Sequence, residues 1–129
     1  MQFFTTVLAL AATSSAAVLP RSPLGSWYAQ VTVSPDHSIY LTAKYTSDAY
    51  PDGLRNACID NPFANPPFHR CDHAEFDFTY DGKFLNLTQN IEKPNKQTVF
   101  GEAYMPFTED LGDGRIRAEG TVFVTRAIA

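Results

Sequence analysis

The chain has 129 residues and a formal net charge of −4, with 10 Lys and Arg residues against 14 Asp and Glu residues. This length is typical of one domain, and the absence of a basic excess argues against nucleic acid as a partner, because nucleic-acid binding leaves a basic footprint. No stretch approaches the roughly 20 apolar residues of a membrane-spanning helix, so we expect no membrane association either.

The N-terminus predicts an export signal over residues 1–17. An apolar run from Phe3 to Ala12 leads into the small residues 13–17, with Ser15 and Ala17 placed for cleavage before Val18. We therefore expect a secreted, extracellular protein. Residues 18–25 form a short N-terminal stub in this interpretation, and residues 26–129 form a single β domain.

Two runs of alternating apolar and polar residues follow, and they predict the first hairpin. Residues 27–33 and 39–45 each place apolar side chains on one face, and residues 34–38 contain the Pro and Asp of a turn. Residues 46–74 hold four prolines, so we expect no regular element longer than a few residues there.

Cys58 and Cys71 lie in this proline-rich stretch. An even number of cysteines in an exported chain indicates a disulfide. The short loop that it would close gives a stabilisation on the order of 3 kcal/mol.

Alternation resumes at residues 76–80, and Asp81-Gly82 predicts a type I′ hairpin turn. The return strand runs over residues 83–91, with Leu85, Leu87 and Ile91 facing inward. Strands over residues 99–105 and 115–125 come next, and Gly101 in the first of them predicts a bulge or a close approach of chains. About six to eight strands predict an all-β fold. We expect an antiparallel meander curled into a small barrel or a two-layer sandwich.

Two chemical hypotheses involve the polar cluster that follows the prolines. A metal site would use His69 and His73 with Asp72 or Glu75, but the spacing suits a helix, so a surface cluster is favoured, and we predict no metal and no cofactor. A hydrolase or ribonuclease would need Glu75 with His37 or His73, and an Arg. Glu75 and Asp77 are expected on one outward face as solvated charges. No nucleophile motif is present, so we predict a protein that is not an enzyme.

The segment between the cysteines is the predicted binding surface, with Phe63, Phe68, His69 and Arg70 as contact residues. Aromatic side chains on a proline-braced loop are typical interface anchors, although both Phe rings could instead fold under the loop as a small core. Asn86 begins an N-glycosylation sequon and is expected to face outward.

Three motifs along the mature chain resemble the major-allergen family first known from Alternaria, whose members are secreted fungal β-barrel proteins, several of them elicitors or effectors toward plants. The motifs are residues 71–78 (CDHAEFDF), 85–89 (LNLTQ) and 99–106 (VFGEAYMP). The resemblance implies that the family's first intrachain disulfide falls on Cys58 and Cys71. The family's second disulfide, expected near residues 107–120, is missing, and so is the cysteine that links two subunits, so no disulfide-linked dimer is expected.

These observations predict a secreted, non-catalytic, effector-like or allergen-like fungal protein that binds a host extracellular protein. A carrier of a small apolar ligand and a secreted hydrolase or ribonuclease are the alternatives.

Overall fold

The structure is a computed structural model that describes residues 24–129. The predicted signal peptide and most of the predicted stub lie outside the described residues. The described chain is all-β and contains nine strands: β1 (Ser26–Val33), β2 (Ile39–Ser47), β3 (Tyr50–Asn61), β4 (Phe68–Cys71), β5 (Phe76–Tyr80), β6 (Phe84–Ile91), β7 (Gln97–Tyr104), β8 (Glu109–Asp110) and β9 (Ile116–Ile128).

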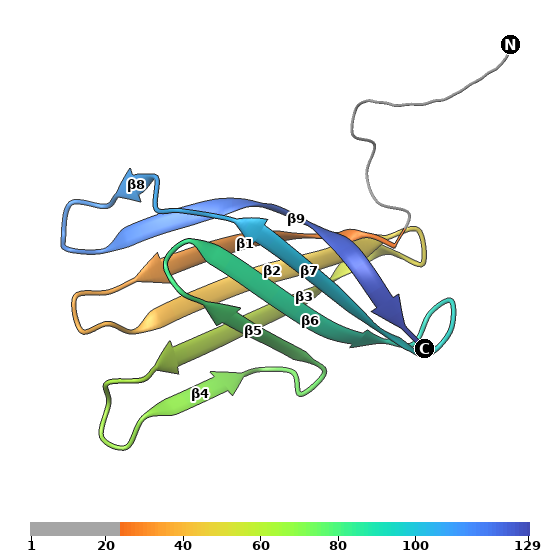
Figure 1. Cartoon of the computed structure of the whole chain (residues 1–129), viewed down its shortest axis with the longest axis horizontal. Helices are drawn as coiled ribbons and strands as arrows, with labels where there is room; N and C mark the ends of the chain where they lie inside the picture. Colours follow the sequence, from red (N-terminus) through yellow and green to blue (C-terminus); the bar gives the residue numbers. More distant parts are fainter. Residues whose placement is uncertain (1–23) are drawn as a thin grey trace, which may run out of the picture.

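The strands form one antiparallel sheet in the order β4-β3-β2-β1-β9-β7-β6-β5, with β8 paired to β9. The first and last long strands lie side by side, from Ser26 opposite Phe123 to Val33 opposite Ile116. This pairing joins two meanders, and the sheet curls into a barrel that is nearly closed (Figure 1). Of the two predicted architectures, the barrel is therefore confirmed, and its two edges are β4 and β5.

The prediction that residues 46–74 hold no long element is wrong, because β3 spans 12 residues of this stretch. Its prolines lie where a strand tolerates them. Pro51 falls in an irregular part of β3 that has a partner strand on one side only, so its missing N–H leaves no ladder bond unmade. Gly53 takes a positive φ of 84° in the same irregularity, and Pro62 follows the last residue of the strand.

The predicted type I′ turn at Asp81-Gly82 is also wrong. Gly82 has a positive φ of 95°, whereas Asp81 does not, and the flanking pair is Tyr80 opposite Leu85. The Asp81 carboxylate accepts hydrogen bonds from the backbone N–H groups of Lys83 and Phe84, at 2.9 and 2.7 Å. This side-chain bonding supports a longer loop without a second left-handed residue.

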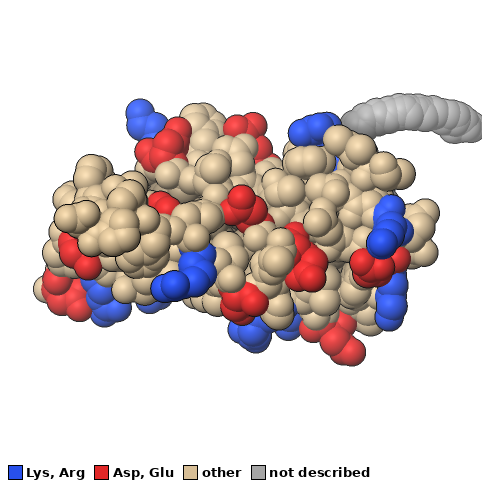
Figure 2. Space-filling model, turned by 90° about the horizontal axis from the view of Figure 1, so that it is seen from below, with Lys and Arg blue, Asp and Glu red and all other residues tan. Residues whose placement is uncertain are grey.

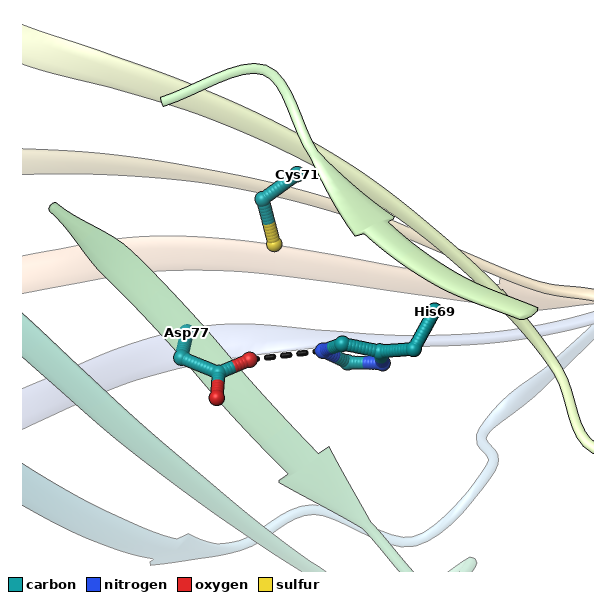
Figure 3. Close-up of side chains that lie close together, drawn as sticks. All are labelled: His69, Cys71 and Asp77. Carbon is teal, nitrogen blue, oxygen red and sulfur yellow. Dashed lines mark hydrogen bonds and ion pairs between the residues drawn. The ribbon is translucent and has the colours of Figure 1, made fainter. Parts of the chain in front are cut away.

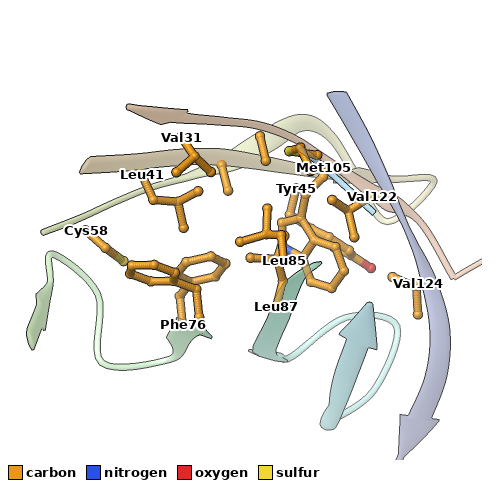
Figure 4. Close-up of a cluster of buried hydrophobic side chains, with 14 of the residues drawn as sticks. Val31, Leu41, Tyr45, Cys58, Phe76, Leu85, Leu87, Met105, Val122 and Val124 are labelled. Carbon is orange, nitrogen blue, oxygen red and sulfur yellow. The ribbon is translucent and has the colours of Figure 1, made fainter. Parts of the chain in front are cut away.

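The barrel interior is filled by apolar side chains from both meanders (Figure 4). Trp27 lies at its centre with no exposed surface, and its indole N–H donates to Gln89 Oε1 at 2.9 Å. Gln89 Oε1 also accepts from Asn56 Nδ2 at 3.1 Å. Three strands (β1, β3 and β6) are thus joined through a buried polar network, as a buried indole requires.

Gly101 confirms both features predicted for it. The pairing of β7 with β9 shifts register between Phe100 and Gly101, and the backbone lies directly against the buried indole. A Cβ atom at Gly101 would lie 2.7 Å from Trp27 Cζ3 and 2.8 Å from the Phe123 carbonyl oxygen.

The predicted disulfide is present. Cys58 on β3 lies directly opposite Cys71 on β4, with Cα atoms 4.0 Å apart. Because β4 has four residues, few ladder bonds hold it, and the disulfide supplies a covalent connection to the sheet.

We expect Gly101→Ala to lower the free energy of unfolding by about 1–3 kcal/mol, because the added methyl group overpacks the indole. Gly120→Ala is the matched control, since its Cβ would meet Met105 Cε at an ordinary 3.4 Å. Urea unfolding measures both, and equal stability of the two variants would contradict the role given to Gly101.

A Cys58→Ala/Cys71→Ala variant should lose about 3 kcal/mol, the value that loop closure gives for a short loop. Urea unfolding of this variant against the wild type tests the value. A loss well under about 1 kcal/mol would show that packing alone holds β4 in place.

Candidate functional site

The two edges of the barrel, β4 and β5, meet without backbone ladder pairing among the described strands. We call the gap between β3 and β4 on one side and β5 and β6 on the other the seam. β4 pairs only with residues 58–61 of the 12-residue strand β3, so it covers the last third of that edge and leaves the rest uncovered. The covered and uncovered parts of the seam hold different side chains and have different uses.

His69 bridges the part of the seam that β4 covers (Figure 3). Its Nδ1 lies 3.0 Å from Asp60 Oδ1 on β3, and its Nε2 lies 2.6 Å from Asp77 Oδ1 on β5. An ionised carboxylate only accepts hydrogen bonds, so contact with two carboxylates favours an imidazolium that donates from both nitrogens. We call this arrangement the His69 bridge.

The pKa of His69 reflects two opposing causes. Burial disfavours the charged ring and lowers the pKa, whereas the hydrogen bonds to Asp77 and Asp60, together with the negative charges of these residues, raise it by more. The net result is a pKa above the ordinary value of 6.5. The ring also packs against Phe78 at 5.1 Å between centroids, so it covers the core as well as carrying charge.

Glu75 and Asp77 are both exposed, as predicted, but the prediction gave Asp77 no partner. Its carboxylate crosses the seam to His69, although most of the side chain stays exposed. Strand alternation fixes the face on which a side chain lies but does not reveal a partner on a neighbouring sheet edge.

The ligand pair of the disfavoured metal hypothesis, His69 and His73, is not brought together in the described structure. Within residues 24–129, the one group of three or more possible ligands within 4.8 Å of one another is His69, Cys71 and Asp77. Both nitrogens of His69 already contact carboxylates, and the Cys71 sulfur is bonded to Cys58. His73 lies elsewhere, with Nε2 3.8 Å from Asp72.

The predicted binding surface lies at the turn between β3 and β4. Phe63 is 75% exposed there, so the alternative in which both Phe rings fold inward does not hold for it. Phe68 is half-buried, and the Arg70 guanidinium lies 5.4 Å from its ring centroid. We call Phe63, Phe68 and Arg70 the hairpin tip. His69, the fourth predicted contact residue, belongs to the His69 bridge.

The hairpin tip is fixed against the turn between β1 and β2. The ring of His37 contacts that of Phe63 at 5.0 Å, and His37 takes a left-handed φ of 69°. Buried Asn61 donates to Ser38 Oγ at 3.1 Å and accepts from the Phe63 N–H at 3.0 Å. Sequence reasoning missed Ser38, Asn61 and this role of His37, since the contact joins residues about 25 positions apart.

The uncovered part of the seam holds a pocket of about 230 Å³, which we call the seam pocket. It is lined by Tyr50, Leu54, Arg55, Asn56, His73, Glu75 and residues 89–92. Of the acid–base residues that the hydrolase alternative would use, Glu75 and His73 meet here with Arg55, whereas His37 contacts Phe63 of the hairpin tip. In the part of the chain that the structure describes, no hydrogen bond joins Glu75 to His73.

Charged side chains of both signs are interspersed on the face that carries the seam (Figure 2). Two arginines near the C-terminus contact nearby side chains: Arg115 forms an ion pair with Asp113 at 2.9 Å, and the Arg126 guanidinium lies 4.0 Å from the Phe100 ring centroid. Asn86 is exposed on the outer face of β6, opposite Thr79 and Glu102, as the sequon requires for access.

Comparison with protein-family models, with curated proteins and with solved structures gives no match for this chain. The resemblance to the Alternaria allergen family therefore stays a prediction. Within residues 24–129 there is no helix with the length and apolar character to cross a membrane.

The His69 bridge predicts how stability depends on pH. Because the pKa of His69 is raised in the folded chain, the bridge contributes fully below the ordinary pKa of 6.5, and its contribution is lost as the pH rises through the folded value. The side chain is 39% exposed, so we expect less than about 1 kcal/mol. Urea unfolding between pH 5 and about pH 8 measures the change.

His69→Gln should remove this part of the pH dependence, whereas His73→Gln should retain it, because the His73 ring lies 3.8 Å from Asp72 and takes no part in the bridge. Identical pH profiles for the wild type and His69→Gln would show that the bridge does not stabilise the fold.

Proposed function

We propose that this chain is a secreted, non-catalytic protein that acts in the extracellular space by binding a host protein through the hairpin tip. The main support is the exposure of Phe63, a large aromatic side chain that is 75% exposed at the end of the β3–β4 hairpin. Aromatic and Arg anchors dominate binding energy at protein interfaces, and the hairpin tip offers both. The resemblance to fungal effector-like proteins supports a plant host.

Rigidity of the hairpin tip supports the same proposal. The disulfide holds the base of the hairpin, and the Asn61–Ser38 hydrogen bond and the His37 ring hold its end. A side chain that is already fixed loses little conformational entropy on binding, so more of the contact energy appears as affinity. We expect the partner to receive Phe63 in an apolar pocket.

The two alternatives receive less support. A carrier with an internal cavity needs an empty barrel, whereas Trp27, Tyr45 and Leu85 are buried in this one. A hydrolase is favoured by the meeting of Glu75, His73 and Arg55 at the seam pocket. A catalytic acid and base are typically within hydrogen-bond reach of the reacting group, and the described structure offers no bonded pair among these residues.

Ion leakage from plant leaf tissue infiltrated with the purified protein tests the proposal. We expect leakage from the wild type, and a loss of about tenfold or more in potency for Phe63→Ala, as for removal of an interface anchor. Tyr104→Ala is the matched control, because Tyr104 is another largely exposed aromatic residue, 64% exposed on β7 and away from the hairpin tip. Thermal unfolding confirms that both variants fold.

Equal potency of Phe63→Ala and Tyr104→Ala would exclude the hairpin tip as the contact surface. Absence of leakage from the wild type across several hosts would remove cell-death elicitation from the proposal. We also propose that Asn86 carries a glycan, so the assay includes an Asn86→Gln protein to separate any effect of the glycan from that of Phe63.

A further inference from the structure

The seam pocket exists because β4 is short. Ladder pairing of β4 ends at Cys58, so the preceding residues of β3 have no neighbouring strand on that side. The connection from β4 to β5 instead bonds to β6: the Asn90 N–H on β6 donates to the carbonyl oxygen of Glu75, the last residue before β5, at 2.9 Å. The pocket of about 230 Å³ lies between this connection, the first half of β3 and the end of β6.

Asn56, which contributes to the lining of the pocket, is 1% exposed and has an unpaired amide oxygen. The contacts of the amide identify which of its two end atoms is the oxygen. Its Nδ2 faces three acceptors: the carbonyl oxygens of Ala43 at 3.3 Å and Leu54 at 3.4 Å, and Gln89 Oε1 at 3.1 Å. Exchange of the nitrogen and oxygen would place oxygen against oxygen in all three contacts, so Oδ1 is the atom left without a donor.

This oxygen is also closed to solvent, so water does not compensate for the missing hydrogen bond. Among the side-chain atoms that the structure describes, only Arg117 Nε shares this condition, and it does not line the pocket. Gln89, beside Asn56, already uses its Oε1 to accept two hydrogen bonds. Asn56 thus brings a buried acceptor without a donor to the lining of the pocket, and an occupant that carries a hydrogen-bond donor would pair it.

The other lining residues define the kind of occupant. Leu54 and Ile91 provide apolar contact, while Arg55, Glu75 and Glu92 place charges of both signs in the lining, so the pocket does not select a ligand of one charge. Drug-sized ligands occupy roughly 300–1,000 Å³, so this smaller pocket suits a single ring. A neutral ring with an apolar face and several hydroxyl groups that both donate and accept satisfies all of these features.

We propose that the seam pocket binds one pyranose sugar residue, with a hydroxyl group donating to Asn56 Oδ1, the apolar face of the ring against Leu54 and Ile91, and further hydroxyl groups bonding to Arg55 and Glu75. Because Asn56 Oδ1 is closed to solvent in the unbound chain, this binding mode requires the amide to turn toward the pocket. This site lies apart from the hairpin tip, so it does not depend on the proposed function.

Titration of the ¹⁵N-labelled protein with glucose, mannose, galactose and N-acetylglucosamine, followed by NMR, tests the proposal. We expect saturable shifts for at least one sugar, with a Kd at or below about 10 mM, centred on the amides of residues 54–56 and 89–92. Phenol is titrated in parallel as a single-ring hydroxyl compound that lacks the ring hydroxyl array of a sugar.

Arg55→Ala and Glu75→Gln should each weaken sugar binding at least about fivefold. Arg126→Ala, which removes an exposed Arg on β9, and Phe63→Ala should leave binding unchanged. These rim variants carry the test, because Asn56→Ala also removes three hydrogen bonds within the fold. Absence of saturable shifts for every sugar, shifts centred elsewhere, or binding of phenol alone would overturn the proposal.

Discussion

The buried indole of Trp27 sets the constraint on which the rest of the barrel depends. An indole N–H in a closed apolar interior needs an acceptor, and Gln89 supplies it from the opposite meander. Gln89 in turn holds Asn56 on β3, so one network ties three strands together across the core. The large ring also needs space, which Gly101 provides by the absence of a side chain.

The same network explains why an unpaired polar atom lies beside the seam. The amide of Asn56 gives its two protons to acceptors of the barrel, and its oxygen remains unpaired beside the part of the sheet edge that β4 does not reach. A longer β4 would cover this edge. Instead, the seam has a part that β4 covers and the His69 bridge crosses, and a part that holds the pocket.

The hairpin tip and the seam pocket thus follow from one feature, the short strand β4. The disulfide and the His69 bridge hold this strand where few backbone hydrogen bonds do, and the hairpin can then present Phe63 to solvent without loss of order. The hairpin tip follows the C-terminal end of β3, and the seam pocket lies against its first half, so the proposed protein partner and the proposed sugar occupy different places.

The sequence by itself determined the class of fold, most strand positions and the disulfide, because alternation, turn residues and paired cysteines are local signals. It also indicated that Gly101 marks a bulge or a close approach. It misjudged β3 because proline is excluded from central strands but tolerated at an edge, and only the tertiary structure shows which strand edges are free. The partners of His69, the contact of His37 with Phe63, and the network of Trp27, Gln89 and Asn56 likewise depend on closure of the sheet. Each joins strands or turns whose adjacency follows from register and curvature, which alternation along a single strand does not specify.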